Sequence, residues 1–322
     1  MKIFGKEIKL FNYSLEGKGV MKEPEGPKNL KNFFISYFRK FGQLVTVNIY
    51  MIFGNFPVLF ALLALSGNLN VHLPAPASKL YTVLYGVLRD TGSPVLSALN
   101  GVYGMRGDLS LPTTATNVCW ALSLLLIFTF GLVNVGTTYI LRNMVKGEPI
   151  FMWSDFWYAI KRNWRQGLIL GALDLVFMFV IAYDILFFYT NIGSFMLNVF
   201  FWFSLFLAVI YYFMRFYMYI VMITFDLSIF KILKNAVIFA ILGFKRNFMA
   251  LLGMALVLFL TAGIFSIFIP LGIIIPFVCL FSTCAYMSAY AAFPKIKQYM
   301  IDPYYEEEED DEDFEPIFKD RG

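Results

Sequence analysis

Two charged side chains inside long apolar runs are the first candidates for chemistry in this chain. Asp174 lies about eight residues into the run 167–190, and Arg215 lies at a similar depth in the next run, 195–220. If both runs cross a membrane, a charge at that depth is costly and is usually paired or functional. The sequence therefore predicts that Asp174 and Arg215 face each other, either as a structural ion pair or as a substrate or proton site.

The other reactive residue types form no catalytic or metal-binding pattern. His72 is the single histidine, and a lone imidazole makes neither a catalytic dyad nor a typical metal site. Cys119, Cys279 and Cys284 sit in or beside apolar runs at spacings that fit no zinc or redox motif, so we interpret them as small buried hydrophobic residues. We expect no enzymatic activity, no cofactor and no bound metal.

The composition is that of a polytopic membrane protein. Of the 322 residues, 59% are hydrophobic and only 15% are charged, and the mean hydropathy is +0.67. A soluble domain contains about 25% charged residues. A spanning helix needs about 20 mainly apolar residues. The windows that qualify are 43–65, 118–140, 167–190, 195–220, 248–269 and 271–293.

The break between the last two windows falls at 270–272, Pro-Leu-Gly. This sequence is compatible with a tight hairpin or with a kink in one helix. We favour the hairpin, because the apolar run 248–293 is too long for a single crossing.

Lysine and arginine near the span ends predict the orientation. The segment before the first span carries nine of them, the connection 141–166 five and the connection 221–247 four. The opposite side carries only Lys79, Arg89 and Arg106. Because cytoplasmic connections are enriched in these residues, we expect a multi-pass plasma-membrane protein with both termini in the cytoplasm.

A basic-aromatic phrase, Lys-Arg-Asn followed by an aromatic residue, occurs at 161–164 and again at 245–248. Each copy precedes a long apolar run, and a looser copy lies at 32–43. We interpret the phrases as parts of helices that lie at the inner membrane surface, with aromatic rings at headgroup depth and cations toward anionic lipid. The residues assigned to the two clearer copies are Phe156, Lys161, Arg162, Trp164 and Arg165 in the first, and Lys245, Arg246 and Phe248 in the second.

These phrases divide the chain into three units, 28–140, 150–223 and 232–293. The units are either internal repeats of the kind found in transporters, or unrelated segments. In the second case, basic and aromatic residues are favoured independently at each cytoplasmic end of a span. The predicted fold class is an all-α membrane protein with six transmembrane helices. They form three hairpins, each preceded by a cytoplasmic interfacial helix, with both termini inside.

Composition divides the chain into a hydrophilic cytoplasmic segment, 1–29, a six-span membrane domain, 30–295, and an acidic tail, 296–322. Half of the 22 acidic residues lie between Asp302 and Asp320, so we predict a disordered cytoplasmic tail. The tail is either a solvated terminus or a binding site for a basic partner.

The segment 66–117 is predicted to be an external insertion in the membrane domain. Its stretch 78–90 has leucines at helical spacing, with Ser78 as a possible N-cap. We expect a short helix on the outer face, acting as a structural cap or as a lid or docking surface.

The connection after the second span predicts a rigid corner. Gly131 and Gly136 provide a small-residue flank where a neighbouring helix can approach closely. Gly147 is placed to end the span as its C′ residue. Asp155 is predicted to cap a surface helix whose first residue is Phe156.

This corner resembles the YesL-like family of bacterial integral membrane proteins, which is grouped under a domain of unknown function. The resemblance implies an accessory role beside carbohydrate uptake systems, and it assigns no functional residue. The chain departs from the family pattern by Leu132, where the family usually has Pro, and by about 50 extra residues between the first two spans. The matching residues are Gly131, Arg142, Val145, Lys146, Gly147, Glu148, Asp155 and Phe156, with Asn48 and Pro57 in the first span.

Two functions are therefore open. The first is a non-catalytic integral membrane protein, an accessory or partner-binding component of carbohydrate (ABC-type) uptake. Its partners would be the lipid bilayer and a sugar ABC permease or another membrane protein, with no role for nucleic acid and with an open oligomeric state. The alternative is a small secondary transporter with a mid-membrane site near Asp174 and Arg215.

Overall fold

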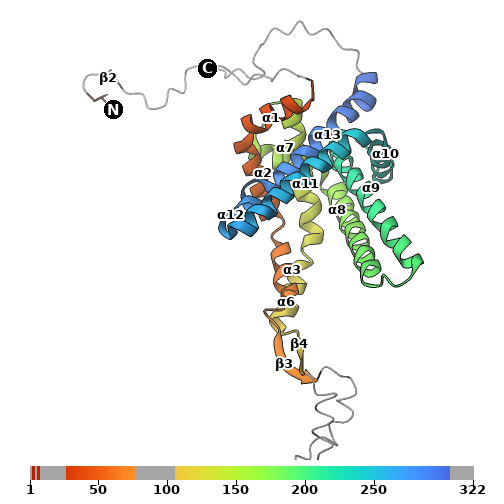
Figure 1. Ribbon diagram of the computed structural model, residues 1–322. Coiled ribbons are helices and arrows are strands. Elements are labelled where there is room, and N and C mark those ends of the chain that lie inside the picture. Colours follow the sequence, from red (N-terminus) through yellow and green to blue (C-terminus); the bar gives the residue numbers. More distant parts are fainter. Residues whose placement is uncertain (1, 4–5, 8–26, 77–105, 305–322) are drawn as a thin grey trace, which may run out of the picture. The chain divides into compact units, whose positions relative to one another are not determined.

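The computed structural model describes residues 2–3, 6–7, 27–76 and 106–304 (Figure 1). The chain forms two compact units, one of residues 1–54 and 130–322 and the other of residues 55–129. In the described ranges, five helices are long and apolar enough to cross a membrane, or six if a broken pair near the start is counted as one span. The protein is therefore a predominantly helical, membrane-type chain.

The smaller unit contains two packed helices and a two-stranded ribbon. Thr113 accepts a hydrogen bond from the main chain of Thr116, which caps the second helix, and the Thr113 hydroxyl donates to the carbonyl of Leu69 at 2.7 Å. The sequence did not predict the ribbon, and the helix expected at 78–90 lies outside the described residues. The elements are α3 (Pro57–Leu65), β3 (Val71–Pro76), β4 (Arg106–Leu111) and α6 (Thr114–Ser123), with β3 and β4 antiparallel.

The larger unit contains the remaining helices, with the first turn of α7 assigned to the smaller unit. It also contains the short antiparallel strands β1 (Lys2–Ile3) and β2 (Lys6–Glu7). In chain order the helices are α1 (Leu30–Arg39), α2 (Phe41–Gly54), α7 (Leu126–Lys146), α8 (Met152–Thr190), α9 (Phe195–Thr224), α10 (Ile229–Leu242), α11 (Phe244–Ile267), α12 (Ile269–Ile275) and α13 (Phe281–Ile296). A π-helical segment (Pro276–Leu280) joins α12 to α13, and a second one (Lys297–Ile301) and a 3-10 turn (Asp302–Tyr304) follow α13.

The second half of α9 forms the centre of the larger unit. Every residue from 216 to 223 is buried, because α8, α10 and α13 all pack against this helix (Figure 1). A helix that is apolar all round is expected in such a position. The first half of α9 and the second half of α8 instead expose large apolar side chains such as Phe179 and Phe195, which suits contact with lipid chains.

Two of the predicted spans have different boundaries in the structure. The window 43–65 is broken into α2 and α3, because Pro57 opens α3 and cannot donate the hydrogen bond that would continue the helix. The expected surface helix at 156–166 and the span after it are parts of one kinked helix, α8. The kink lies at Asn163, where the backbone leaves helical geometry with φ −117° and ψ 20°.

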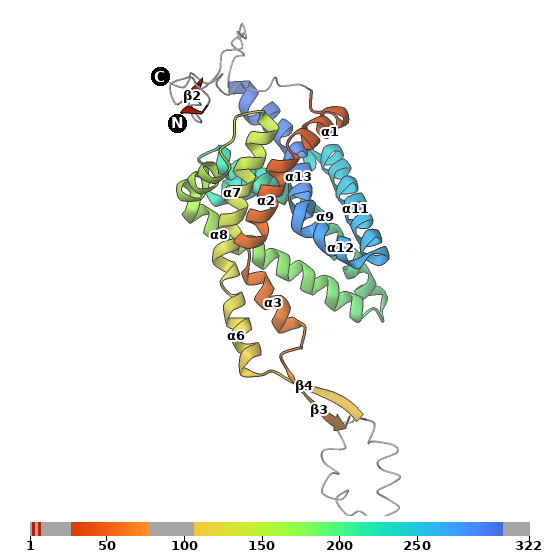
Figure 2. The same cartoon turned by 90° about the vertical axis from the view of Figure 1, so that its left-hand side faces the viewer.

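The chain turns between α11 and α12 at Phe268, which has extended dihedral angles of φ −144° and ψ 92°. The two helices then lie side by side (Figure 2). A Cβ atom on Gly272 would overlap the main chain of Phe265, so this glycine permits the close contact.

Candidate functional site

The structure brings Asp174 of α8 and Arg215 of α9 into contact. The Arg215 Nε lies 2.9 Å from Asp174 Oδ1 and 3.1 Å from Oδ2. The Asp174 carboxylate also accepts hydrogen bonds from the hydroxyl of Tyr211 at 2.6 Å and from that of Tyr219 at 3.0 Å. Three donors from one helix therefore converge on a single carboxylate of its neighbour.

The spacing of these donors explains the geometry. Residues 211, 215 and 219 follow one another at intervals of four, which places them on one face of α9. Asp174 is fully buried and the Arg215 side chain is 23% exposed. The carboxylate is thus neutralised and hydrogen-bonded inside the protein, as a buried charge requires. Sequence analysis missed the two tyrosines, although their spacing around Arg215 was visible.

A small polar cavity adjoins Arg215. Its volume is about 110 Å³, and Asn134, Thr138 and Ser288 contribute polar groups to its lining along with Arg215 and Tyr219. Ligand-binding pockets usually have volumes of about 300–1,000 Å³. The cavity is large enough for several water molecules and too small for a typical organic substrate in this conformation.

Glycine residues allow α7 and α8 to cross in main-chain contact. A Cβ atom on Gly131 would overlap the carbonyl oxygen of Gly167, and one on Gly171 would overlap the Cα of Gly131. Gly136 of α7 is covered by the ring of Phe156 in the same way. Small residues commonly permit such close helix packing in membranes.

The corner after α7 ends in a Schellman motif. Gly147 has a φ of +77°, the amide of Glu148 donates to the carbonyl of Asn143 at 3.1 Å, and that of Gly147 donates to Met144 at 3.4 Å. The side chains of Lys146 and Glu148 form an ion pair. This arrangement fixes the direction in which the chain leaves the helix.

Arg142 connects the corner to the central helix. Its guanidinium donates to the Asn143 side chain at 2.9 Å, and to the carbonyl of Ile223 and the hydroxyl of Thr224 at the end of α9. Helix C-termini leave carbonyl groups without intrahelical partners. Arg142 therefore supports the end of α9.

Asp155 differs from its expected role. The surface helix was expected to begin at Phe156 with Asp155 as its cap, but α8 begins at Met152 and its N-cap residue is Phe151. Asp155 lies in the first turn, and its carboxylate accepts a hydrogen bond from the amide of Phe151 at 2.9 Å. Because a carboxylate in the first turn can reach back to the unpaired amide before it, this position also stabilises the helix start.

Phe156 and Trp164, the two aromatic residues assigned to the first basic-aromatic helix, lie in different surroundings. Phe156 was expected at headgroup depth, but only 7% of it is exposed, because its ring covers Gly136. Trp164 is 49% exposed, and the Arg165 guanidinium lies over its ring at 5.2 Å. Lys161 and Arg162 are exposed. The exposed residues keep the character expected of an interfacial helix, whereas Phe156 belongs to the packed core.

The second basic-aromatic helix exposes Phe248 and Lys245 but not Arg246. The Arg246 guanidinium donates to the carbonyls of Tyr290 and Lys28, both at 3.2 Å. Tyr290 lies four residues before Pro294, which has no amide to donate, so its carbonyl lacks the usual helical partner. Arg246 thus satisfies a carbonyl that a proline leaves open.

The asparagine of each phrase was not among the predicted site residues, but it holds a helix junction. Asn163 donates to the carbonyl of Ala159 at 3.1 Å, where α8 departs from helical geometry. Asn247 donates to the carbonyl of Ala240 at 3.1 Å and accepts from the hydroxyl of Tyr217 at 2.8 Å. In both copies the side-chain amide of the asparagine donates to a main-chain carbonyl near the end of the preceding helical segment.

Asn48 of α2 binds the π-helical segment near α13. Its amide nitrogen donates to the carbonyls of Pro276 and Phe277 at 2.9 and 2.7 Å, and its oxygen accepts from the amide of Ser282 at 3.0 Å. The side chain is fully buried. It therefore replaces hydrogen bonds that the irregular helix cannot make with itself.

No cluster of three or more histidine, cysteine, aspartate or glutamate side chains is placed to hold a metal ion in the part of the chain that the structure describes. The polar side chains described above form ion pairs or bind helix ends and irregular helix segments.

Part of the chain is similar to a known family of proteins. A family model described as "Protein of unknown function, DUF624" matches residues 113–185. The match includes α6, α7 and most of α8, and thus the glycine crossing, the corner at Gly147 and Asp174. No curated protein and no solved structure matches this chain.

Proposed function

We propose that this chain is a non-catalytic integral membrane protein that works by binding another membrane protein, with a sugar ABC-type permease as the expected partner. The corner motif and its YesL-like pattern support the carbohydrate-uptake context. The proposed location is the plasma membrane, with both termini in the cytoplasm, and the oligomeric state remains open.

One observation favours this proposal over the alternatives. The Asp174 carboxylate, the strongest sequence candidate for chemistry, is fully buried and bonded to Arg215 and two tyrosines. A general acid or base must reach a reacting group, whereas this carboxylate is enclosed among its own donors. We therefore assign a structural role to the ion pair and place the function on the exposed surfaces of the protein.

Chemical crosslinking in native membranes tests the proposal. The full chain would carry an affinity tag, and crosslinked partners would be identified by mass spectrometry. A sugar permease enriched over an unrelated six-span protein of equal abundance is the expected result. If crosslinks connect the chain to no other membrane protein, partner binding is wrong.

The acidic tail is a separate part of this test. Most of its length lies outside the described residues, so its role rests on sequence alone. Replacing the acidic run 306–313 by Gln and Asn retains chain length while removing its charge. Loss of copurification would assign the contact to the tail, and unchanged copurification would assign it to the membrane domain.

The polar cavity beside Arg215 favours one second candidate, a small secondary transporter. Thr138 and Ser288 line the cavity, and the Ser288 hydroxyl donates to the carbonyl of Ala285 at 2.7 Å. The double variant Thr138→Val, Ser288→Ala removes polar lining groups while leaving the ion pair in place. A transporter is expected to lose substrate uptake in this variant, whereas an accessory protein is expected to retain permease binding and support uptake as before.

A further inference from the structure

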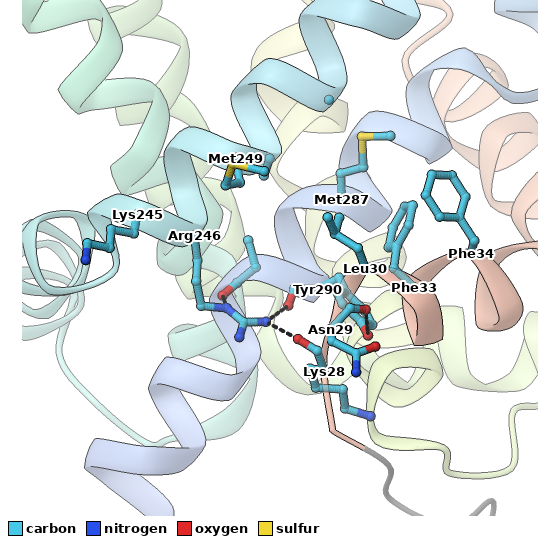
Figure 3. Close-up of a pocket in the computed structure, with 13 residues that line it drawn as sticks. Lys28, Asn29, Leu30, Phe33, Phe34, Lys245, Arg246, Met249, Met287 and Tyr290 are labelled. Carbon is cyan, nitrogen blue, oxygen red and sulfur yellow. Dashed lines mark hydrogen bonds between the residues drawn. The ribbon is translucent and has the colours of Figure 1, made fainter.

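A second, larger pocket lies among the start of α1, the first turns of α11 and the middle of α13 (Figure 3). Its volume is about 370 Å³, within the usual range for ligand-binding pockets. All of its lining residues belong to the larger unit. It is separate from the Asp174 network.

The body of this pocket is apolar. Phe33, Met249 and Met287 contribute to its walls, together with Leu30 and Ala250. Methionine side chains are flexible and adapt to irregular apolar ligands. Gly253 adds no side chain to the wall, and a Cβ atom there would meet the Met287 side chain, at 3.3 Å from Sδ and 3.7 Å from Cε. The lining suits a hydrocarbon chain.

One end of the pocket is basic. Arg246 lies there, and its guanidinium is fixed by the carbonyls of Tyr290, Ala291 and Lys28 (Figure 3). Lys245 lies beside it in the lining. Lys28 also lines the pocket, and its ammonium group donates to the carbonyl of Val145 at 2.6 Å. None of the described residues that line the pocket is an aspartate or a glutamate.

One helix start adds to this positive end, since Leu30 is the first residue of α1. The N-terminal end of a helix carries partial positive charge and favours anions. Fixed cations, a helix start and an adjoining apolar groove together match a molecule with an anionic head and a hydrocarbon tail.

We propose that this pocket is a binding site for an anionic phospholipid of the bilayer. The phosphate group lies against Arg246 and Lys245, and one acyl chain occupies the groove beside Gly253. Basic pockets between membrane helices bind anionic headgroups in this way. The site does not rest on the proposed permease contact.

The repeated phrase supplies a matched control. The pocket beside the first copy is lined by Arg162, Trp164, Arg165 and also Asp226, so an acidic side chain faces its cations. Lys161 is exposed, as Lys245 is, but does not line either pocket. Lys245→Gln and Lys161→Gln therefore remove the same charge from the same sequence context, at the proposed site and away from it.

Native mass spectrometry of the purified full-length protein tests the charge requirement. Phosphatidylglycerol and phosphatidylcholine with identical acyl chains would be added in equal amounts. The wild-type protein should retain phosphatidylglycerol preferentially, Lys245→Gln should reduce this preference about five-fold, and Lys161→Gln should leave it unchanged. Equal retention of the two lipids by the wild type, or equal loss in both variants, would overturn the proposal.

A second pair of variants tests the groove. Gly253→Leu fills the space beside Met287, whereas Gly263→Leu lies on the same helix with no atom within 4 Å of its Cβ. Gly253→Leu should lower occupancy by both lipids, and Gly263→Leu should not. Thermal unfolding in detergent identifies a folded variant, and a folded Gly253→Leu protein that binds lipid as the wild type does would contradict the assignment.

Discussion

At the scale of single residues, main-chain carbonyl groups bind several of the cations near the ends of helices. The ammonium groups of Lys28 and Lys40 donate to the carbonyls of Val145 and Met144, near the end of α7, at 2.6 and 2.8 Å. Arg142 does the same at the end of α9. Helix C-termini carry partial negative charge and unpaired carbonyls. Lysines and arginines of the segments that we predict to be cytoplasmic thus also stabilise helix ends.

Removing the carboxylate of Asp174 should be strongly destabilising. Asp174→Leu leaves the Arg215 guanidinium without its counter-charge, and breaking a buried pair from one side costs about 3–5 kcal/mol. The double variant Asp174→Leu, Arg215→Met should recover most of this loss, because no charge then remains unpaired. Unfolding by SDS in mixed micelles measures the stability of both variants.

These two variants also distinguish a structural ion pair from a transport or proton site. The two tyrosine hydroxyls lose their acceptor in the double variant, so recovery should be incomplete. A structural ion pair predicts that the double variant binds its partner normally. Loss of function in a double variant of near wild-type stability would instead assign the charges to a transport or proton site.

Asn48→Ala should lower stability by about 1–3 kcal/mol, because the carbonyls of Pro276 and Phe277 and the amide of Ser282 lose their bonding partner in an apolar setting. Asn198 provides the control, since it is exposed on α9. Thermal unfolding of both variants in the same detergent measures the difference. Equal melting temperatures would show that the three bonds to Asn48 contribute little.

At the scale of helices, the α7–α8 crossing depends on residues without side chains. Gly171→Ala places a methyl group against the main chain of Gly131, which cannot rotate away. Overpacking of this kind costs about 1–3 kcal/mol or more. The variant should therefore unfold at a lower temperature or lower denaturant concentration than the wild type.

Gly263→Ala is the matched control for this prediction. It lies in the interior of a membrane-type helix, with no atom within 4 Å of the added Cβ. Alanine has the higher helix propensity, by about 1 kcal/mol in water, so this variant should be neutral or slightly stabilised. A similar loss in both glycine variants would show that the close crossing is not the cause.

The helix boundaries show what local sequence predicts. Residues 232, 236, 239 and 240 of α10 are buried on one face against α9, and this spacing is readable from the apolar pattern. The junction predicted between a surface helix and the following span lies near the kink of α8 at Asn163. Local sequence did not indicate that the two segments join as one kinked helix, because a change from polar to apolar residues marks only a change of surroundings.

At the scale of the whole molecule, the distribution of Lys and Arg predicts that both termini are cytoplasmic. Cysteine labelling tests this orientation. The three native cysteines are replaced by Ala, and a single cysteine is then introduced by Ser78→Cys or by Asp311→Cys. A membrane-impermeant maleimide should label the cysteine at 78 in intact cells, and the cysteine at 311 only after permeabilisation. Labelling of the cysteine at 311 from outside would reverse the orientation.

Sequence alone determined that this is an apolar, helical, membrane-type chain, because the length and hydropathy of its segments are local properties. It also indicated Asp174 and Arg215 as a candidate pair, since charges at that depth need partners. The tertiary structure decided which groups meet. Tyr211 and Tyr219 complete the ion pair, Phe156 turns inward onto Gly136, and Arg246 binds a carbonyl opened by Pro294.

The lipid pocket likewise exists only in the folded chain. Lys28, Arg246 and Met287 are far apart in sequence and come together where the start of α1, the first turns of α11 and the middle of α13 line one pocket. Local composition limits which residues face lipid or water. The contacts between distant helices are set by side-chain shape and by the demand that buried polar groups find partners, and these conditions are met only by the whole fold.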